Sequence, residues 1–246
     1  MSDDTILYGI NPVRALLESG RPVNQIKIAN GKGNNRLQQI VDLARDRGLN
    51  IQFVERTALD RMVGQGVHQG VVVRTAPRQG LDWGGLLDAV EDNPHTLIVV
   101  LDEVEDPHNL GAIMRSAEAF GAMAVVQTKD RSAPLSAAAI KASAGAAERL
   151  DLVKVTNLAR ALEQLQKANV WVVGLAGDEE SVPMGDIDFK GPIALVLGNE
   201  GRGLRRLTRK HCDQLAAIPM QSAVESLNVS VAGGVALYEV ARQRAE

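Results

Sequence analysis

The amino-acid sequence predicts an α/β protein, in which a small α/β unit precedes a larger unit whose mostly parallel sheet is flanked by helices. In the larger unit, continuous runs of Val, Ile and Leu alternate with segments of helical periodicity, as expected for strands that are buried on both faces. The 246 residues are 45% hydrophobic and 23% charged, which is ordinary for a globular protein. Between the two units, Ala76-Pro-Arg-Gln-Gly80 interrupts the periodicity and is typical of a linker.

The first unit alternates helices and strands and is close to the smallest size that folds alone. We expect helices at 12–18, 36–47 and 58–62, and strands at 25–29, 51–54 and 70–75. Residues 1–78 contain 11 Lys and Arg against 7 Asp and Glu, whereas acidic residues are in excess in the remainder of the chain. A basic accessory module suits a polyanionic partner such as nucleic acid, and a merely solvated surface is the alternative interpretation.

The second unit follows a helix expected at 82–92. Its expected strands lie at 96–101, 122–127, 152–155, 170–175, 193–197 and 215–218, and its expected helices at 110–120, 136–147, 158–167, 204–210 and 227–244. In sheets of this kind, ligands bind beyond the carboxyl ends of the strands. Polar segments follow Leu101, Leu197 and Ile218, so these three loops form the candidate binding region.

Asn109 and Arg115 are the candidate functional residues of the first polar segment. Asn109 suits the N-cap position of a helix, and Arg115 follows six residues later. An arginine this close to the positive end of a helix is mildly unfavourable. Arg115 is therefore a candidate ligand for an anion or a hydroxyl group, and a surface ion pair with Glu118 is the competing interpretation.

The second polar segment is rich in glycine, with Gly198, Gly201 and Gly203 in six residues. Glycines allow the backbone to approach a ligand closely or to adopt a positive φ. The pattern is neither G-x-G-x-x-G nor G-x-x-x-x-G-K-[ST], so a standard dinucleotide or phosphate loop is not indicated. Glu200, embedded among the glycines, favours a functional role over a simple tight turn.

The third polar segment follows Ile218 and leads into the last helix. Ser226 is expected to accept hydrogen bonds from the first turn of that helix. Asn228 and Ser230 then lie near the mouth of the helix, where polar groups are costly unless they have partners. The segment therefore predicts a bound group.

Taken in order, the three segments carry a family resemblance. The motifs Asn109-x-Gly111-x-x-x-Arg115, Leu197-Gly-Asn-Glu-Gly-Arg-Gly203 and Ile218-Pro-Met…Ser226-Leu-Asn-Val-Ser230 resemble, in order and spacing, the three motifs of the SpoU (TrmH) RNA 2′-O-methyltransferases. Tyr8-Gly-Ile-Asn-Pro-Val-Arg-Ala-Leu-Leu and Val67-His-Gln-Gly70 are similar to the accessory domain of bacterial guanosine methylases of large-subunit rRNA. The resemblance covers essentially the whole chain.

This resemblance implies a fold, a cofactor and an activity. It implies a deep trefoil knot at the carboxyl end, which the alternation of strands and helices does not predict, and a homodimer. It implies that S-adenosylmethionine binds in the knot and that a methyl group passes to a ribose 2′-hydroxyl of a guanosine in 23S rRNA. The partner would be 23S rRNA or a large-subunit assembly intermediate, and the accessory domain would resemble ribosomal proteins that bind RNA.

The resemblance also implies roles for particular residues. The cofactor-binding residues would be Gly198, Gly201, Ile218 and Leu227. The catalytic set would be Arg115, Glu200, Asn228, Asn109 and Ser226. Arg115 would hold the target phosphate and stabilise the developing alkoxide, because a guanidinium hardly loses its proton in a protein. Glu200 would orient this arginine or take the proton.

Basic residues are the candidates for RNA contact, because only 3% of the chain is aromatic and base stacking is therefore limited. The candidates are Arg14, Lys32 and Arg36 in the first unit and Arg202, Arg205 and Arg206 beside the glycine loop. We expect the accessory domain at 1–76, a linker at 77–94 and the knotted domain at 95–246.

Several classes of function are disfavoured. The four histidines lack metal-ligand spacing and there is one cysteine, so we expect no metal. No signal peptide or apolar membrane span is present, which predicts a cytoplasmic protein without a membrane partner. A tRNA methylase, a non-catalytic protein for RNA binding or ribosome assembly, and an α/β enzyme acting on a small nucleotide or phosphorylated metabolite are the alternatives.

Overall fold

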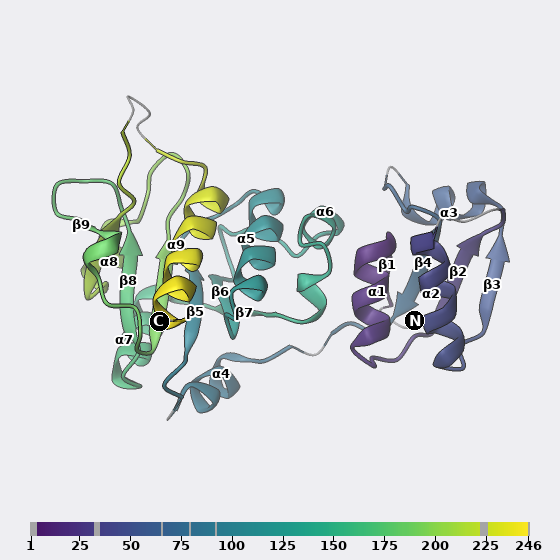
Figure 1. Ribbon diagram of the computed structural model, residues 1–246, viewed down its shortest axis with the longest axis horizontal. Coiled ribbons are helices and arrows are strands. Elements are labelled where there is room, and N and C mark those ends of the chain that lie inside the picture. Colours follow the sequence, from purple (N-terminus) through teal and green to yellow (C-terminus); the bar gives the residue numbers. More distant parts are fainter. Residues whose placement is uncertain are drawn as a thin grey trace. The chain divides into compact units, whose positions relative to one another are not determined.

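The computed structural model describes residues 4–31, 35–64, 66–78, 80–91, 93–221 and 226–245 (Figure 1). Two units are distinguished by their internal contacts. The first comprises residues 1–79 together with 143–149, and the second comprises residues 80–142 and 150–246. Lys32, one of the predicted RNA contacts, lies outside the described residues.

The first unit contains a mixed four-stranded sheet in the order β1-β4-β2-β3. Its elements are β1 (Thr5–Tyr8), α1 (Ile10–Glu18), β2 (Gln25–Ala29), α2 (Asn35–Asp46), β3 (Ile51–Val54), α3 (Arg56–Val63) and β4 (Val71–Thr75). Strand β4 runs antiparallel to both of its neighbours, whereas β2 and β3 are parallel. Strand β1 was not predicted, because it has four residues and buries only Leu7.

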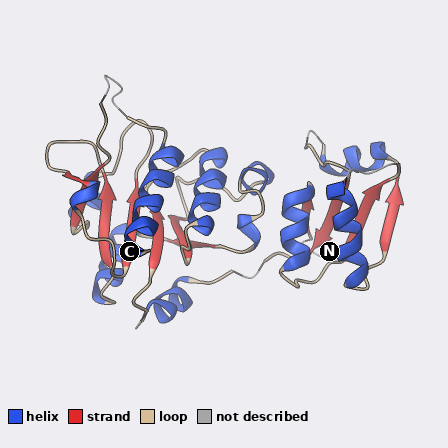
Figure 2. Ribbon diagram, viewed as in Figure 1, coloured by secondary structure: helices blue, strands red, loops and turns tan. Residues whose placement is uncertain are grey.

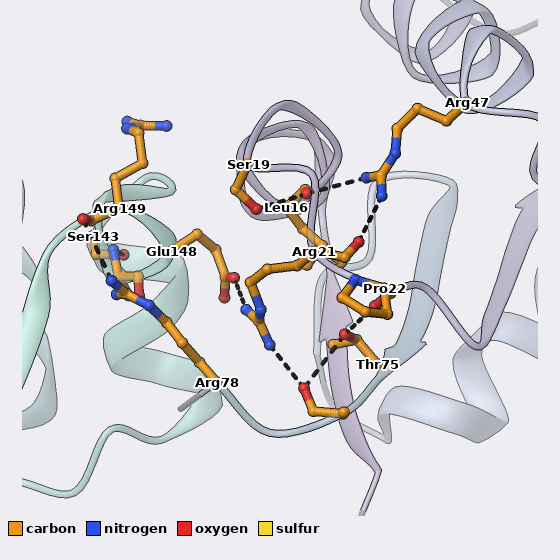
Figure 3. A network of polar contacts seen from close by, with 12 residues as sticks. Leu16, Ser19, Arg21, Pro22, Arg47, Thr75, Arg78, Ser143, Glu148 and Arg149 are labelled. Carbon is orange, nitrogen blue, oxygen red and sulfur yellow. Dashed lines mark hydrogen bonds and ion pairs between the residues drawn. The ribbon is translucent and has the colours of Figure 1, made fainter. Parts of the chain in front are cut away.

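The region 143–149 belongs to the first unit although it follows α6 (Ala137–Ala142) in the chain. It contains a short 3₁₀ helix, η1 (Ala146–Glu148), and Figure 3 shows its polar contacts. The Arg21 guanidinium donates to the Glu148 carboxylate and, at 2.7 Å, to the Ala76 carbonyl. A Cβ added at Gly145 would lie 3.0 Å from that of Ala15 on α1, so glycine allows this close packing.

The second unit contains a seven-stranded sheet in the order β7-β6-β5-β10-β8-β11-β9, with parallel neighbours. The strands are β5 (Leu97–Leu101), β6 (Ala124–Thr128), β7 (Asp151–Val155), β8 (Trp171–Leu175), β9 (Val182–Pro183), β10 (Ile193–Leu197) and β11 (Gln214–Ala217). The other helices are α4 (Trp83–Val90), α5 (Pro107–Ala119), α7 (Leu158–Lys167), α8 (Arg206–Lys210), α9 (Val229–Arg244) and the 3₁₀ turn η2 (Met184–Asp186). The predicted α/β class and mostly parallel sheet are confirmed.

Helices cover both faces of this sheet (Figure 2). On one face, α4 and α7 contribute Leu86, Leu162 and Leu165 to a core with Val100 and Val196. On the other face, α5 and α9 pack side by side. Every residue of β5, β6 and β10 is buried, which explains why their sequences are continuous apolar runs. Strands β5 and β10 lead directly into two of the three loops that the sequence marks as polar.

One predicted element of this unit ends earlier than expected, and one element was not predicted. The helix expected at 136–147 ends at Ala142, because Ala144 and Gly145 adopt positive φ values of 51° and 100° that a helix cannot accommodate. The two-residue strand β9 was not predicted, since it is too short to carry a periodic pattern. Within the described residues, no helix is both long enough and apolar enough to cross a membrane.

Cys212 packs against the sheet beside β8. A Cβ added at Gly174 would lie 2.7 Å from the Cys212 Sγ, so the thiol occupies space that only a glycine leaves open. Burial, followed by the negative charges of Asp213 and Asp102, raises the pKa of the Cys212 thiol to about 12. The thiol remains protonated in the physiological pH range.

We predict that Cys212 resists alkylation in the folded protein. At pH 8.5 an ordinary thiol is roughly half ionised, and a pKa of about 12 lowers the thiolate fraction, and with it the iodoacetamide rate, by about three orders of magnitude. Mass spectrometry of timed samples measures the rate, and the guanidinium-unfolded chain is the control. Equal rates in the two states at pH 8.5 would contradict the prediction.

Candidate functional site

A cavity of about 350 Å³ opens at the carboxyl ends of β8, β10 and β11. Its lining includes the four residues predicted to bind a cofactor, together with two of the predicted catalytic residues: Gly198, Gly201, Ile218, Leu227, Glu200 and Ser226. The second and third polar segments of the sequence therefore meet at one cavity. Most of the lining surface is apolar, which suits a ligand with a flat apolar part and a few polar groups.

The glycine loop, residues 198–204, folds back on itself along one wall of the cavity. Asn199 and Gly203 exchange two backbone hydrogen bonds of 3.1 and 2.9 Å. A Cβ added at Gly198 would lie 2.3 Å from the Gly203 carbonyl carbon and 2.4 Å from the Leu204 nitrogen. Gly203 has a φ of +63°, in the left-handed region. Glycine is thus required at both ends of the loop for two different reasons.

Glu200 connects all three polar segments through hydrogen bonds. Its Oε1 accepts from the Asn109 Nδ2, in a short contact, and from the Asn228 Nδ2 at 3.0 Å. The Asn228 Nδ2 also donates to the Asn109 Oδ1 at 3.1 Å. Asn109 is buried on α5, Glu200 lies on the glycine loop and Asn228 precedes α9. These three residues form the polar triad of the site.

The caps of the two site helices differ from the prediction. Helix α5 begins at Pro107, and the Asp106 carboxylate caps it by accepting from the His108 N–H at 2.8 Å, so Asn109 is inside the first turn. The Asn228 Oδ1 caps α9, because it accepts from the backbone N–H of Ser230 at 2.9 Å. Asn109 and Ser226 were therefore wrongly predicted as caps. Each true cap lies within three residues of the predicted one.

Arg115 stands apart from the triad. It is exposed in the third turn of α5, and no hydrogen bond or ion pair joins it to the triad within the described part of the chain. Ser226 likewise lines the cavity without a hydrogen bond among the described residues. Of the five predicted catalytic residues, the structure brings Asn109, Glu200 and Asn228 into mutual contact.

The predicted RNA contacts differ in whether their side chains are already paired within the protein. Arg36, Arg202 and Arg206 are exposed and unpaired within the described part of the chain. Arg14 is exposed and its Nε donates to Glu18 at 2.7 Å, a helical pair of modest strength. The fifth described candidate, Arg205, is committed to carboxylates.

Sequence reasoning missed the carboxylates that bind Arg205. Asp102 is fully buried, and its two oxygens accept from the Arg205 backbone N–H at 2.9 Å and from the Arg205 Nε at 2.6 Å. Glu103 accepts from the Arg205 Nη1 at 3.2 Å. The sequence feature that could have indicated them is an Asp-Glu pair directly after a buried strand, because a carboxylate in that position needs a partner. Among the described residues, no group of His, Cys, Asp and Glu is arranged to hold a metal ion.

Comparisons with known proteins agree with this arrangement of motifs. The model of the SpoU rRNA methylase family matches residues 96–238, and the model described as RNA 2′-O ribose methyltransferase substrate binding matches residues 6–81. The two matches cover most of the chain. The chain belongs to the SpoU rRNA methylase family.

Individual proteins are similar to this chain over nearly its whole length. The chain is 49% identical to the 23S rRNA (guanosine-2′-O-)-methyltransferase RlmB of Yersinia pestis over 245 residues, which is 97% of each chain. It is 44% identical to RlmB of Escherichia coli K12 over 240 residues, covering 97% and 98% of the two chains. The crystal structure of the SpoU methyltransferase AviRb from Streptomyces viridochromogenes, in complex with the cofactor AdoMet, superposes with a TM-score of 0.78 at 25% identity and covers 98% of this chain and 91% of that one.

We predict that Gly198→Ala disrupts the cavity, because the new Cβ would meet backbone atoms 2.3–2.6 Å away that cannot move independently. Gly201→Ala is the matched control, since its Cβ would meet only the Asn199 Oδ1 at 3.9 Å. Thermal unfolding should show a loss of several degrees for Gly198→Ala and a change of about one degree for Gly201→Ala. Equal melting temperatures for the two variants would contradict the packing described for Gly198.

Proposed function

We propose that this protein transfers the methyl group of S-adenosylmethionine to the ribose 2′-hydroxyl of a guanosine in 23S rRNA. The polar triad carries the proposal: three segments far apart in the sequence place two amides around one carboxylate oxygen at a cavity of cofactor size. Relatives that cover nearly the whole chain at 44–49% identity bear the name of this activity, which supports the same conclusion.

The cavity fits the cofactor on the chemistry of its walls. Glycine backbone at Gly198 and Gly201 lets a flat base and a ribose approach the main chain, and Ile218 and Leu227 offer apolar surface. The related protein AviRb has been crystallised with AdoMet, which supports the choice of cofactor. When bound, S-adenosylmethionine supplies an electrophilic methyl group on a sulfonium centre, so the protein has to supply orientation and an acceptor for a proton.

Glu200 is suited to handle the proton of the 2′-hydroxyl. Transfer would form a bond between the 2′-oxygen and the methyl carbon and break the carbon–sulfur bond, whose electron pair stays on sulfur. The hydroxyl proton must then leave, and a carboxylate held in one orientation can take it directly or through water. Asn109 and Asn228 hold that carboxylate, and neither can donate from any position other than its amide nitrogen. The triad therefore fixes the direction in which the remaining lone pairs of Glu200 point.

Arg115 acts as a cation in this proposal and not as a base. A guanidinium keeps its proton in a protein, so it stabilises negative charge on the target phosphate or the developing alkoxide. The absence of a hydrogen bond or ion pair to Arg115 among the described residues leaves its five donors available for RNA. Arg36, Arg202 and Arg206, which are also exposed and unpaired there, are proposed to bind phosphates of the same RNA.

The first unit favours rRNA over tRNA as the substrate. A substrate-binding family model matches residues 6–81, whereas the structure of the Aquifex aeolicus TrmH/SpoU tRNA modifying enzyme covers only 66% of this chain at a TM-score of 0.57. The substrate is 23S rRNA or a large-subunit assembly intermediate, and the protein acts in the cytoplasm. We propose an accessory domain at 1–76, a linker at 77–94 and a catalytic domain at 95–246 that forms a deep trefoil knot. The position of β10 between β5 and β8 supports a threaded chain.

We also propose a homodimer formed through α9. Val231, Val235 and Tyr238 follow one another at helical spacing and are 50%, 41% and 58% exposed. A row of large apolar side chains on an otherwise well-packed helix is typical of a surface that another subunit covers. Tyr238 is held at that surface by an edge-on contact with Phe120 at 6.2 Å between ring centres.

Methyl transfer from labelled S-adenosylmethionine tests the proposed function. Protein-free 23S rRNA should acquire 2′-O-methylguanosine, identified by nucleoside analysis, and bulk tRNA should not. Arg115→Ala should lower kcat by about 100-fold or more while cofactor affinity stays within about twofold, because the arginine stabilises charge that develops only during transfer. Methylation of tRNA alone would overturn the substrate, and full turnover by the variant would remove Arg115 from the mechanism.

Val235→Glu should weaken the dimer, because a carboxylate would be buried without a partner in the interface. Sedimentation velocity over a concentration series should show a monomer fraction that rises at least tenfold at micromolar protein. Phe53→Glu is the matched control, since Phe53 is similarly exposed, at 52%, on β3 of the first unit. A dimer that tolerates Val235→Glu as well as Phe53→Glu would place the interface elsewhere.

A further inference from the structure

The buried carboxylate of Asp102 forms an ion pair with the exposed side chain of Arg205 at the base of the glycine loop. Asp102 directly follows β5 and is 0% exposed, and among the described residues its carboxylate accepts hydrogen bonds from Arg205 alone. Arg205 donates two hydrogen bonds to this carboxylate. Its backbone N–H donates to one carboxylate oxygen and its side-chain Nε donates to the other. A buried carboxylate is costly unless it is paired with good geometry, so this arrangement strongly favours one position of Arg205.

Glu103 binds the polypeptide on both sides of the turn in the glycine loop. Its carbonyl accepts from the Asn199 Nδ2 at 2.9 Å, and its carboxylate accepts from the Arg205 Nη1 at 3.2 Å. Glu103 has a φ of +59°, which non-glycine residues rarely adopt. Residues 102 and 103 thus hold the glycine loop at Asn199 and at Arg205, the two positions that flank its turn.

Glu200 lies between those two anchors. Its carboxylate accepts hydrogen bonds from Asn109 and Asn228, which do not belong to the loop. The position of its Oε1 is therefore set by contacts from α5 and α9 on one side and by the anchors of the loop on the other. A loop released at Arg205 would keep the two amides but lose the backbone support that presents Glu200 to them.

We propose that Asp102 and Arg205 are positioning residues for methyl transfer, which hold the glycine loop so that Glu200 stays within reach of the reacting hydroxyl. The proposal rests on the role of Glu200 in the proposed function. It also gives Arg205 a task other than the RNA contact predicted from the sequence, because three of its donors are already engaged. A substitution of Arg205 lowers kcat if the residue positions the loop, whereas it lowers RNA affinity if the residue contacts RNA.

Arg205→Gln is the test variant, because it removes the side-chain bonds and leaves the backbone N–H bond to Asp102 in place. With protein-free 23S rRNA, kcat should fall about 10- to 100-fold, while KM for RNA and the salt dependence of RNA affinity stay within about twofold of the native values. Asp102→Asn should have the same effect, and the double variant should be no slower than the slower single variant, because the two residues act as a unit. Arg205→Lys should recover part of kcat.

Arg206→Gln is the matched control on the neighbouring exposed arginine, which has no bond to a described residue. Here RNA affinity should fall, KM for RNA should rise, and the salt slope of binding should drop by about one unit. If Arg205→Gln behaves like Arg206→Gln instead, Arg205 contacts RNA and the proposal is wrong. Unchanged kcat together with a lowered melting temperature would likewise overturn it, since the pair would then serve stability alone.

Hydrogen–deuterium exchange separates this proposal from the proposed function. In Arg205→Gln, amides of residues 198–205 should exchange at least tenfold faster, and those of α7 should not change. A native protein that methylates no RNA, yet shows this local effect, would disprove the proposed function and leave the anchoring of the loop intact. Unchanged exchange in the loop would refute the anchoring whatever the activity.

Discussion

The close approach of Gly198 to the backbone of Gly203 and Leu204 is the contact on which the rest of the site depends. It turns the chain back on itself directly after β10, at the carboxyl end of this central strand. Glu200 then projects from the turn toward Asn109 and Asn228, which arrive from α5 and from the start of α9. A side chain at position 198 would separate the two arms of the loop, and the three polar segments would no longer converge.

Much of the fold could be predicted because burial on both faces leaves a clear trace in the sequence. Strands β5 and β10 are uninterrupted apolar runs, and their predicted positions agree with the structure to within one residue. The helix caps could not be predicted as well. Asp106 and Asn109 are both good capping residues, and the choice between them depends on where the first turn of α5 meets the sheet, which is a tertiary constraint.

Among the site residues, too, some features could be predicted from the sequence and others could not. The glycine spacing indicated a cavity wall, and Gly198, Gly201, Ile218 and Leu227 do line one cavity. The bond between Asn109 and Asn228 joins residues 119 positions apart and follows from no local pattern. Only the family resemblance, which assigns both residues to one catalytic set, associated them before the structure did.

The arginines show how little a count of charges reveals about binding. Arg244 donates to the carbonyls of Phe189, His95, Thr96 and Gly191, and burial lowers the pKa of its guanidinium. Arg209 pairs with Asp178 and Glu180 on a loop near the cavity. The guanidinium groups of Arg244 and Arg209 are thus already bound within the protein. The charge available to RNA is therefore smaller, and more localised, than the composition suggests.

The seven residues 143–149 affect how this protein can be divided into separate domains. They lie within the region matched by the methylase model, yet their contacts place them in the amino-terminal unit, where Glu148 neutralises Arg21 and the Ala147 carbonyl accepts from Arg78 at 3.0 Å (Figure 3). A module cut at the linker would lack this patch and expose an unmatched arginine. Exchange of recognition modules between relatives therefore requires two grafts, one of them in the middle of the catalytic sequence.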